Sequence, residues 1–213
     1  MTYSAKEIFY TLQGEGGNVG RAAVFLRFAG CNLWSGLERD RTTAVCNFCD
    51  TDFVGINGPG GGKFKTADDL AQAVLSHWPD SGMEMGQRLV VCTGGEPLLQ
   101  LDQAAIEALH QRGFEVAVET NGTIEAPSGI DWLCVSPKAN AKLKQTSGHE
   151  LKLVYPQQLA RPEHFADLNF DQFLLQPMDG PELERNTQLT IDYCMQHPQW
   201  RFSLQTHKVI GVR

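Results

Sequence analysis

Long hydrophobic runs and an excess of positive charge are both missing from this 213-residue sequence. No apolar run reaches the length of a bilayer-spanning helix, and the N-terminus lacks a signal-peptide core, so we expect no membrane partner. The 18 lysines and arginines are outnumbered by 25 acids, which gives a formal net charge of −7. This balance disfavours a broad phosphate-binding surface, and we expect no direct nucleic-acid partner. No internal repeat or low-complexity segment divides the chain, and its length predicts one domain over residues 1–213.

Three of the six cysteines are concentrated in one short region. Cys31 is followed after fourteen residues by Cys46, and Cys49 comes three positions later. Thiolates select iron–sulfur clusters, zinc or cuprous copper. Three thiolates without a local fourth ligand favour a [4Fe–4S] cluster with one open iron, whereas zinc, the alternative, normally needs four ligands in a closed site. Clustered thiols without an export signal also favour the reducing cytoplasm over a disulfide framework. The remaining cysteines lie among apolar residues and are expected in the core: Cys92, Cys134 and Cys194.

Apolar runs alternate with amphipathic segments along the chain. Strands are predicted at residues 21–30, 89–93, 115–120, 132–136, 151–155, 173–177 and 201–204, and helices at 66–79, 101–112 and 181–197. This alternation predicts a parallel sheet with βαβ crossovers. A closed barrel of eight βα units needs about 250 residues. We therefore predict an α/β fold, a partial TIM-like barrel of about six parallel strands with few helices, whose ligands bind beyond the carboxyl ends of the strands.

Two features near the N-terminus suggest ligand contacts. The glycines between Gly14 and Gly17 permit unusual backbone angles and leave amides accessible, although a simple turn is an equal alternative. Arg27 interrupts an otherwise apolar strand that leads to Cys31. A buried arginine needs a partner, which is either a structural carboxylate or an anionic substrate.

The cysteine triplet resembles the cluster-binding motif of the radical S-adenosylmethionine (SAM) superfamily, and the aromatic Phe48 before the last cysteine also matches. The usual spacing between the first two cysteines is three residues, so we predict an enlarged cluster-binding loop at 31–49, with a local insertion near 33–43 that can be helical. The longer loop costs roughly 1.4 kcal/mol of closure entropy, against the order of 10 kcal/mol that thiolate–metal sites contribute. Downstream, Gly94-Gly95-Glu96-Pro97 resembles the superfamily segment that contacts the methionyl amine of SAM.

Several further motifs narrow the resemblance. They are Leu12-Gln-Gly-Glu-Gly16, Gly30-Cys-Asn-Leu33, Cys49-Asp-Thr51, Glu119-Thr-Asn-Gly122, Ser136-Pro-Lys138, Leu175-Gln-Pro-Met-Asp179 and Gln205-Thr-His-Lys208. Together they resemble the 7-carboxy-7-deazaguanine synthase family. The resemblance implies a radical SAM lyase of queuosine biosynthesis that converts 6-carboxy-5,6,7,8-tetrahydropterin to 7-carboxy-7-deazaguanine. It implies hydrogen abstraction from C6, ring contraction and loss of ammonia, with SAM as a catalytic cofactor.

The same resemblance implies a role for each matching residue. The cluster ligands would be Cys31, Cys46 and Cys49, and the Mg²⁺ ligand Thr51. The SAM contacts would be Phe48, Gly94, Gly95, Glu96, Ser136, Pro137, Lys138, Gln176, Pro177, Met178 and Asp179. The contacts to the pterin substrate would be Leu12, Gln13, Gly14, Glu15, Arg27, Thr93, His207 and Arg213. No side chain is assigned as a catalytic acid or base.

The implied partners are a reducing electron donor such as a flavodoxin and a second copy in a homodimer. Two alternatives stay open. A radical SAM activase would make a glycyl radical on a large protein, and would leave Arg27 without a small carboxylate to bind. A non-enzymatic zinc module would be colourless and would not cleave SAM.

Overall fold

The computed structural model describes residues 2–79 and 88–213. Across these ranges nine strands form one sheet, in the order β3-β1-β2-β4-β5-β6-β7-β8-β9. The strands are β1 (Tyr3–Leu12), β2 (Ala22–Phe28), β3 (Gly62–Phe64), β4 (Arg88–Gly94), β5 (Phe114–Thr120), β6 (Trp132–Val135), β7 (Ser147–Tyr155), β8 (Asn169–Pro177) and β9 (Trp200–Phe202). The helices are α1 (Ala67–Ser76), α2 (Gln103–His110), α3 (Leu183–Gln196) and α4 (Thr206–Ile210). Short 3₁₀ helices span Gly16–Asn18, Glu38–Thr43, Pro97–Leu99 and Pro162–His164.

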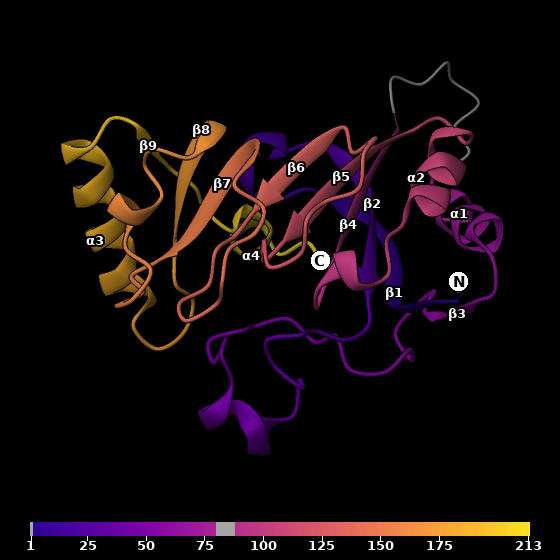
Figure 1. Ribbon diagram of the computed structural model, residues 1–213, viewed down its shortest axis with the longest axis horizontal. Coiled ribbons are helices and arrows are strands. Elements are labelled where there is room, and N and C mark those ends of the chain that lie inside the picture. The colour runs from indigo at the N-terminus through magenta and orange to yellow at the C-terminus, as the bar shows by residue number, and fades with distance from the viewer. Residues whose placement is uncertain (1, 80–87) are drawn as a thin grey trace.

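The sheet is mostly parallel, as predicted. From β2 through β4, β5, β6, β7 and β8 to β9, each strand runs parallel to the next, whereas β1 pairs antiparallel with both β2 and β3. β3 and β9 are the two edges, so the barrel does not close (Figure 1). The predicted α/β class and partial barrel are confirmed, with seven strands in the parallel run instead of about six.

The long antiparallel strand β1 was not predicted, and its charged residues explain why. Lys6 and Glu7 break the apolar pattern of the N-terminal segment, yet both are buried. Lys6 Nζ lies 2.8 Å from Asp52 Oδ2, and Arg27 Nε lies 2.8 Å from Glu7 Oε1. Buried charges are tolerated when they are paired. The partners come from distant segments, so the sequence pattern alone could not reveal that this stretch is a strand.

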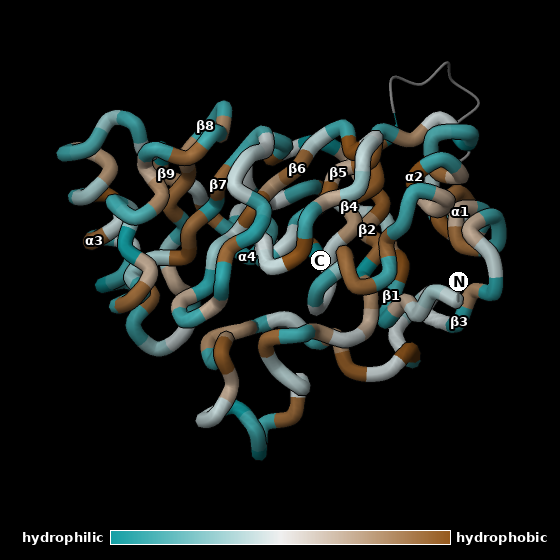
Figure 2. Tube along the Cα trace, viewed as in Figure 1, coloured by the Kyte–Doolittle hydropathy of each residue, from teal (hydrophilic) through white to brown (hydrophobic). Residues whose placement is uncertain are grey.

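Helices cover the sheet at both ends. α1 and α2 lie side by side near β1 and β5, and α3 packs on β8 and β9 (Figure 1). Hydrophobic residues gather along the strands (Figure 2), and the main core includes the fully buried side chains of Leu26, Leu70, Ile106 and Leu153. Burying a side chain of this size contributes about 1.5–3 kcal/mol. Within the described residues, no helix is both long enough and apolar enough to cross a membrane.

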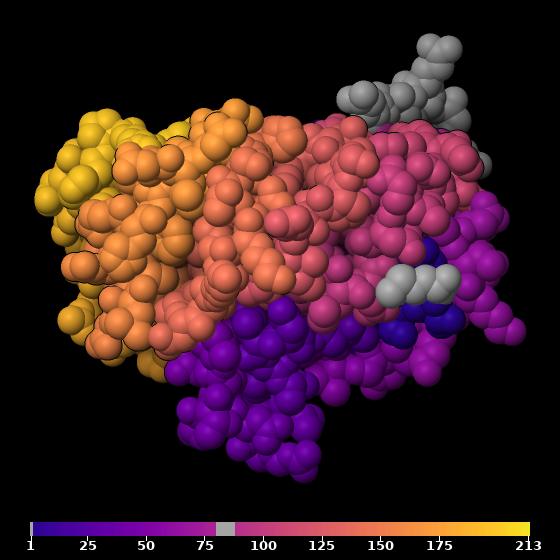
Figure 3. Space-filling model, in the orientation of Figure 1, coloured from indigo at the N-terminus to yellow at the C-terminus, as the bar shows by residue number. Residues whose placement is uncertain are grey.

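The predicted insertion between the first two cysteines is a loop that projects from the sheet (Figure 1, Figure 3). Its 3₁₀ helix, Glu38–Thr43, is held by Arg41. The guanidinium of Arg41 pairs with Glu38 at 2.6 Å and donates to the carbonyls of Asn47 and Cys49, at 2.9 and 3.1 Å. It also lies 4.1 Å from the ring centroid of Trp34. One side chain therefore ties the insertion to the backbone of a predicted cluster ligand.

Thr66 and Asp69 form a capping box at the start of α1. Thr66 Oγ1 accepts from Asp69 N at 3.0 Å, and Asp69 Oδ2 accepts from Thr66 N at 3.1 Å. These bonds satisfy amides that have no partner inside the helix.

We predict that Thr66→Ala lowers the free energy of unfolding by about 1 kcal/mol, because the substitution leaves the Asp69 amide without its acceptor. Thr187→Ala is the matched control. Thr187 is half-buried in α3, and its hydroxyl donates to the Leu183 carbonyl at 2.7 Å, so its loss should be neutral or slightly stabilising. Urea unfolding followed by circular dichroism measures both, and equal losses would contradict the capping role.

Candidate active site

A cavity of about 370 Å³ opens where the parallel strands end. Small-molecule sites typically measure roughly 300–1,000 Å³. Four parallel strands each bring a polar side chain to it at or just beyond their carboxyl ends, where such sheets bind ligands. These side chains are Thr93 in β4, Glu119 in β5, Ser136 after β6 and Gln176 in β8. Every site residue predicted from the sequence lines this cavity except Glu96, Pro137 and Met178.

The three clustered thiols reach the cavity from one loop. Cys46 is buried, and Cys31 and Cys49 are half-buried. A hydrogen bond from Cys46 lowers the pKa of Cys49 to about 6, with a smaller contribution from the positive charge of Lys138. The same bond and burial raise the pKa of Cys46. Cys49 is therefore the thiol that most readily gives the thiolate that a metal requires.

The arrangement of these thiols fits a cluster better than a single ion. Across residues 2–79 and 88–213, no three histidine, cysteine or acidic side chains are placed to hold one metal ion. A [4Fe–4S] cluster is held by thiolates that each bind a different iron, so its ligands share a cavity without meeting at a point. The donor set contains sulfur only, which is the preference of iron–sulfur clusters.

The diglycine at the end of β4 packs directly on the start of the cluster loop. Gly94 has a φ of +118°, which favours glycine. A Cβ at Gly95 would overlap the carbonyl oxygen of Gly30 and come within 2.9 Å of Cys31 Cβ. The Glu96 amide then donates to that Gly30 carbonyl at 3.0 Å. Glycine is needed here because any side chain would displace a thiol of the site.

Glu96 holds this loop from behind and does not line the cavity. It is fully buried, and burial raises the pKa of its carboxyl. Its carboxylate oxygens accept from Leu98 N at 3.0 Å, Thr120 Oγ1 at 2.8 Å and Asn121 N at 2.8 Å. These contacts join the loop after β4 to the end of β5, and the SAM contact predicted for Glu96 stays a prediction.

The two other predicted residues outside the cavity wall make backbone bonds. Pro137 O accepts from Gln157 Nε2 at 3.5 Å, and Met178 N donates to Tyr155 O at 2.7 Å. Their neighbours Ser136 and Lys138 do line the cavity.

Glu7, which the sequence reading missed, lies between two predicted substrate contacts. Arg27 Nε is 2.8 Å from Glu7 Oε1, and the guanidinium of Arg213 pairs with the other oxygen. The N–H of Arg27 Nε is not aligned with that oxygen and is left without a hydrogen bond in the described structure. The ring of Phe9 lies beneath both arginines, with centroid distances of 5.8 and 4.6 Å, and stacks on Phe25. The structural carboxylate considered for Arg27 is therefore present, and the cavity also reaches this guanidinium.

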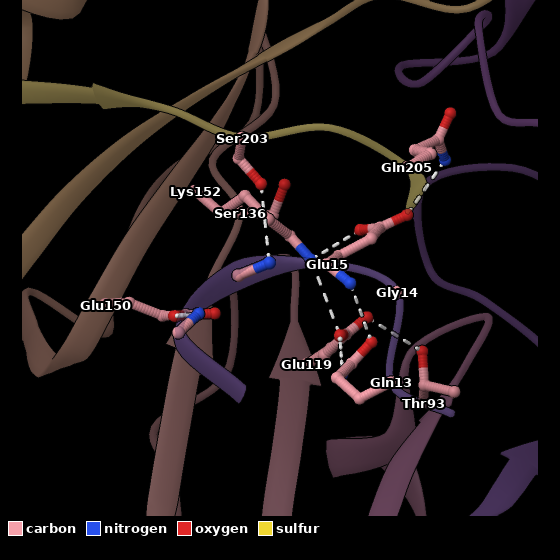
Figure 4. A network of polar contacts seen from close by, with 12 residues as sticks. Gln13, Gly14, Glu15, Thr93, Glu119, Ser136, Glu150, Lys152, Ser203 and Gln205 are labelled. Atoms are coloured by element: carbon pink, nitrogen blue, oxygen red, sulfur yellow. Dashed lines mark hydrogen bonds and ion pairs between the residues drawn. The ribbon is translucent and has the colours of Figure 1, made fainter. Parts of the chain in front are cut away.

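Two further residues that were not predicted, Lys152 and Glu119, join predicted substrate contacts in a polar network beneath the glycine turn (Figure 4). Lys152 Nζ lies 2.6 Å from Glu15 Oε2 and 3.4 Å from Glu119 Oε1. Gln13 Nε2 donates to Glu119 at 3.0 Å, and Thr93 Oγ1 lies 3.4 Å from the other oxygen of that carboxylate. Lys152 interrupts an apolar strand as Arg27 does, and that signal could have identified it.

The C-terminal segment forms another wall of the cavity. Both the amide and the hydroxyl of Thr206 donate to Gly14 O at 2.9 Å. Lys208 Nζ lies 2.6 Å from Asp50 and 2.6 Å from Asp179, so it joins the cluster loop to the turn after β8. His207 lies so close to Gly14 that a Cβ there would overlap its ring. These contacts bring His207 and Arg213 to the same cavity as the thiols.

A partial barrel whose cavity joins three clustered thiols to a diglycine loop is the arrangement of a radical SAM enzyme. No family model matches the chain. It is 67% identical to the 7-carboxy-7-deazaguanine synthase of Caulobacter vibrioides and 62% identical to that of Bradyrhizobium diazoefficiens, in each case over the full length of both proteins. It also matches the crystal structure of QueE from Escherichia coli with a TM-score of 0.71 and 27% identity, over 96% of this chain and 94% of that one. The chain belongs to the 7-carboxy-7-deazaguanine synthase family.

We predict that Glu96→Ala lowers the free energy of unfolding by more than 3 kcal/mol, because it leaves three buried donors without an acceptor. Glu96→Gln keeps one acceptor oxygen, so its free energy of unfolding should fall by less than that of Glu96→Ala. Chemical unfolding under anaerobic conditions gives the stabilities, and equilibrium dialysis gives SAM affinity. A Glu96→Ala protein with normal stability and lost SAM affinity would make Glu96 a direct ligand.

Proposed function

We propose that this cavity holds SAM and the carboxypterin together, with the cluster against the thiol loop and the pterin against the glycine turn. The enzyme converts 6-carboxy-5,6,7,8-tetrahydropterin to 7-carboxy-7-deazaguanine, a radical SAM lyase reaction of queuosine biosynthesis. The observation that carries the assignment of roles is the shared cavity: the thiols, Gly95, Arg27 and the Gln13 turn all line it. One cavity would therefore hold both the cofactor and the substrate.

Cys31, Cys46 and Cys49 would hold the [4Fe–4S] cluster, which, with SAM bound, supplies a carbon-centred radical that abstracts a hydrogen atom. Gln176 supports a SAM site beside them. Its Oε1 is buried without a hydrogen bond in the described structure, and its side chain lines the cavity. A buried acceptor without a donor is costly, so a ligand N–H is its natural partner. Phe48 and the Ser136–Lys138 turn would complete the contacts to SAM, together with the segment from Gln176 to Asp179.

Arg27 would bind the substrate carboxylate. A guanidinium can donate two parallel hydrogen bonds to a carboxylate, which fixes orientation as well as position. The Nε of Arg27 lies 2.8 Å from Glu7, yet within the described residues this buried nitrogen makes no hydrogen bond. Leu12, Gln13, Gly14 and Glu15 would contact the pterin from the glycine turn. Thr93, His207 and Arg213 would contact it from the other walls, as their positions on the cavity surface support.

Mg²⁺ would bind at Thr51, two residues after the last cysteine. A hydroxyl, a substrate carboxylate and waters form an all-oxygen set that suits this cation, which keeps part of its hydration shell. Asp50 and Asp52, which flank Thr51, also line the cavity, and each is paired with a lysine, Lys208 and Lys6 respectively.

Residues 1–213 would act as one radical SAM domain with an enlarged cluster loop at 31–49. The enzyme would work as a homodimer and receive electrons from a low-potential donor such as a flavodoxin.

The direct test is anaerobic incubation of the reconstituted protein with reductant, SAM and the carboxypterin, followed by mass analysis of the product. We expect 7-carboxy-7-deazaguanine from the wild type. Cys46→Ala should bind little iron and form no product, because two thiolates are too few to retain the cluster. Wild-type protein that carries stoichiometric zinc and no iron–sulfur absorption would refute the assignment.

For the substrate site, Arg27→Ala should lower kcat/KM at least about tenfold, since hydrogen bonds to charged groups contribute roughly 1.5–3 kcal/mol. Arg27→Lys should restore only part of this loss, because lysine keeps the charge but not the planar fork. The matched control is Glu7→Gln, which removes the structural partner and leaves the guanidinium in place. If Glu7→Gln lowers kcat/KM as much as Arg27→Ala does, Arg27 serves the scaffold.

For the metal site, Thr51→Val should weaken Mg²⁺ activation, because valine has the shape of threonine without its hydroxyl. Thr51→Ser should retain the activation. The measurement is turnover as a function of added Mg²⁺, with iron content as the check on the cluster. Equal Mg²⁺ dependence in both variants would place the metal elsewhere.

A further inference from the structure

Lys152 is the most deeply buried cation of the cavity. Its side chain on β7 is 4% exposed, whereas those of its partners Glu15 and Glu119 are 14% and 22% exposed. Glu15 reaches this lysine from the glycine turn, and Glu119 reaches it from β5. All three residues line the cavity (Figure 4). A lysine is almost never this buried unless its charge is compensated. Here one ammonium group is shared by two carboxylates.

Other ionisable groups surround this trio. Glu150 lies on the same strand as Lys152, and Cys134 lies on β6, where burial keeps its thiol protonated by raising its pKa. His207 faces Glu15 from α4. Burial lowers the pKa of Lys152, but the charges of Glu119 and Glu15 outweigh that effect and raise it. Burial likewise raises the pKa of Glu15, yet the charge and hydrogen bond of Lys152 bring it to about 2.

The two carboxylates have acceptor positions left over. An ionised carboxylate offers about four lone-pair sites. Glu119 accepts from Gln13 at 3.0 Å, while Lys152 and Thr93 are both 3.4 Å away. Glu15 accepts from Lys152 at 2.6 Å and Gln205 at 2.8 Å. A reduced pterin carries an exocyclic amine and several ring N–H groups, which are donors that need acceptors when they are buried.

We infer that Lys152 is a positioning residue that holds Glu15 and Glu119 as a pair of ionised acceptors for the N–H groups of the pterin ring. The inference rests on the substrate site proposed above and adds Glu119 to it. Lys152 does not touch the substrate; it acts through the two carboxylates that do.

The physical reason for a lysine here is the mutual repulsion of those carboxylates. Two carboxylates that share a buried site without a cation cannot both ionise, so one retains its proton to higher pH. A protonated carboxyl would present an O–H donor to the N–H donors of the substrate. The ammonium group removes that competition and fixes the direction of both acceptors.

The test is Lys152→Met, which keeps the length of the side chain and removes its charge. Lys65→Met is the matched control, because Lys65 is exposed and outside the cavity. Both proteins are reconstituted with the cluster, and three quantities are measured: SAM cleavage without substrate, kcat/KM for the carboxypterin from pH 6 to 8.5, and Tm over the same range.

We expect Lys152→Met to cleave SAM within about twofold of the wild-type rate. Its kcat/KM should fall about a hundredfold at pH 6 and recover by roughly tenfold or more towards pH 8.5, since each unit of pKa change corresponds to a factor of ten. The Tm of Lys152→Met, relative to that of the wild type, should instead fall as the pH rises. Wild-type Glu15, with a lowered pKa, adds stability above its unfolded pKa of about 4.3, whereas carboxyls with raised pKa values lose stability as pH rises through those values. The Tm deficit of the variant should therefore grow with pH.

Three results would overturn the inference. Lys152→Met could show the wild-type kcat/KM and pH profile, or it could lose SAM cleavage as severely as carboxypterin turnover, which would make Lys152 a general structural residue. If Lys152→Met does not fold, Glu119→Gln decides: it leaves Lys152 and Glu15 paired, and an unchanged KM for the carboxypterin overturns the inference. If the wild type fails to convert the carboxypterin, the proposed function itself is refuted. This outcome is distinct from the three above, because each of those compares a variant with an active wild type.

Discussion

The buried carboxylate of Glu96 is the contact on which the geometry of the site depends. It joins the end of β4 to the end of β5 by accepting from Thr120, Asn121 and Leu98. The diglycine before it is thereby held against Gly30, at the entrance to the cluster loop. Cofactor and sheet are thus connected through one satisfied carboxylate in the protein interior. A neutral side chain could fill the same space, but it could not satisfy all of these donors.

The cavity wall contains ion pairs in which one charged group has two partners of opposite charge. Arg27 and Arg213 share Glu7, Lys152 is shared by Glu15 and Glu119, and Lys208 is shared by Asp50 and Asp179. Taking an ion out of water costs several kcal/mol unless it is paired, so this arrangement lets charged groups face a ligand without that cost. In the proposed substrate complex, an incoming carboxylate would compete with Glu7 for the arginines.

The sequence was informative wherever the signal was local. The capping pair at Thr66, the thiols at Cys46 and Cys49 and the diglycine at Gly95 are all recognisable from neighbouring residues, because their chemistry is completed within a few positions. The parallel sheet followed from periodicity. What could not be predicted was which distant groups would meet. No residue next to Glu7 marks it as a partner of Arg27, and only the pairing of β1 with β2 brings the two together.

The contacts of Lys152 could not be predicted either, because they depend on which strands and turns lie next to it. Lys152 reaches Glu15 across 137 positions of sequence, and Glu119 across 33. A period-two pattern shows that Lys152 is in a strand, but not what faces it. Glu96 shows a further limit, since its motif favours a ligand contact but does not reveal the buried bonds that its oxygens accept from Thr120 and Asn121.

The wall formed by the C-terminal segment has a consequence for biogenesis. Chains are synthesised from the N-terminus at about 5–20 residues per second, so the sheet, the thiols and the diglycine all leave the ribosome before Thr206 and Lys208. Until those residues arrive, Gly14 lacks its hydrogen-bond donors and Asp50 lacks its cation. The nascent enzyme therefore passes through a stage in which the thiol loop is complete and the wall facing it is absent. A cluster delivered at that stage would meet a cavity that still lacks its C-terminal wall.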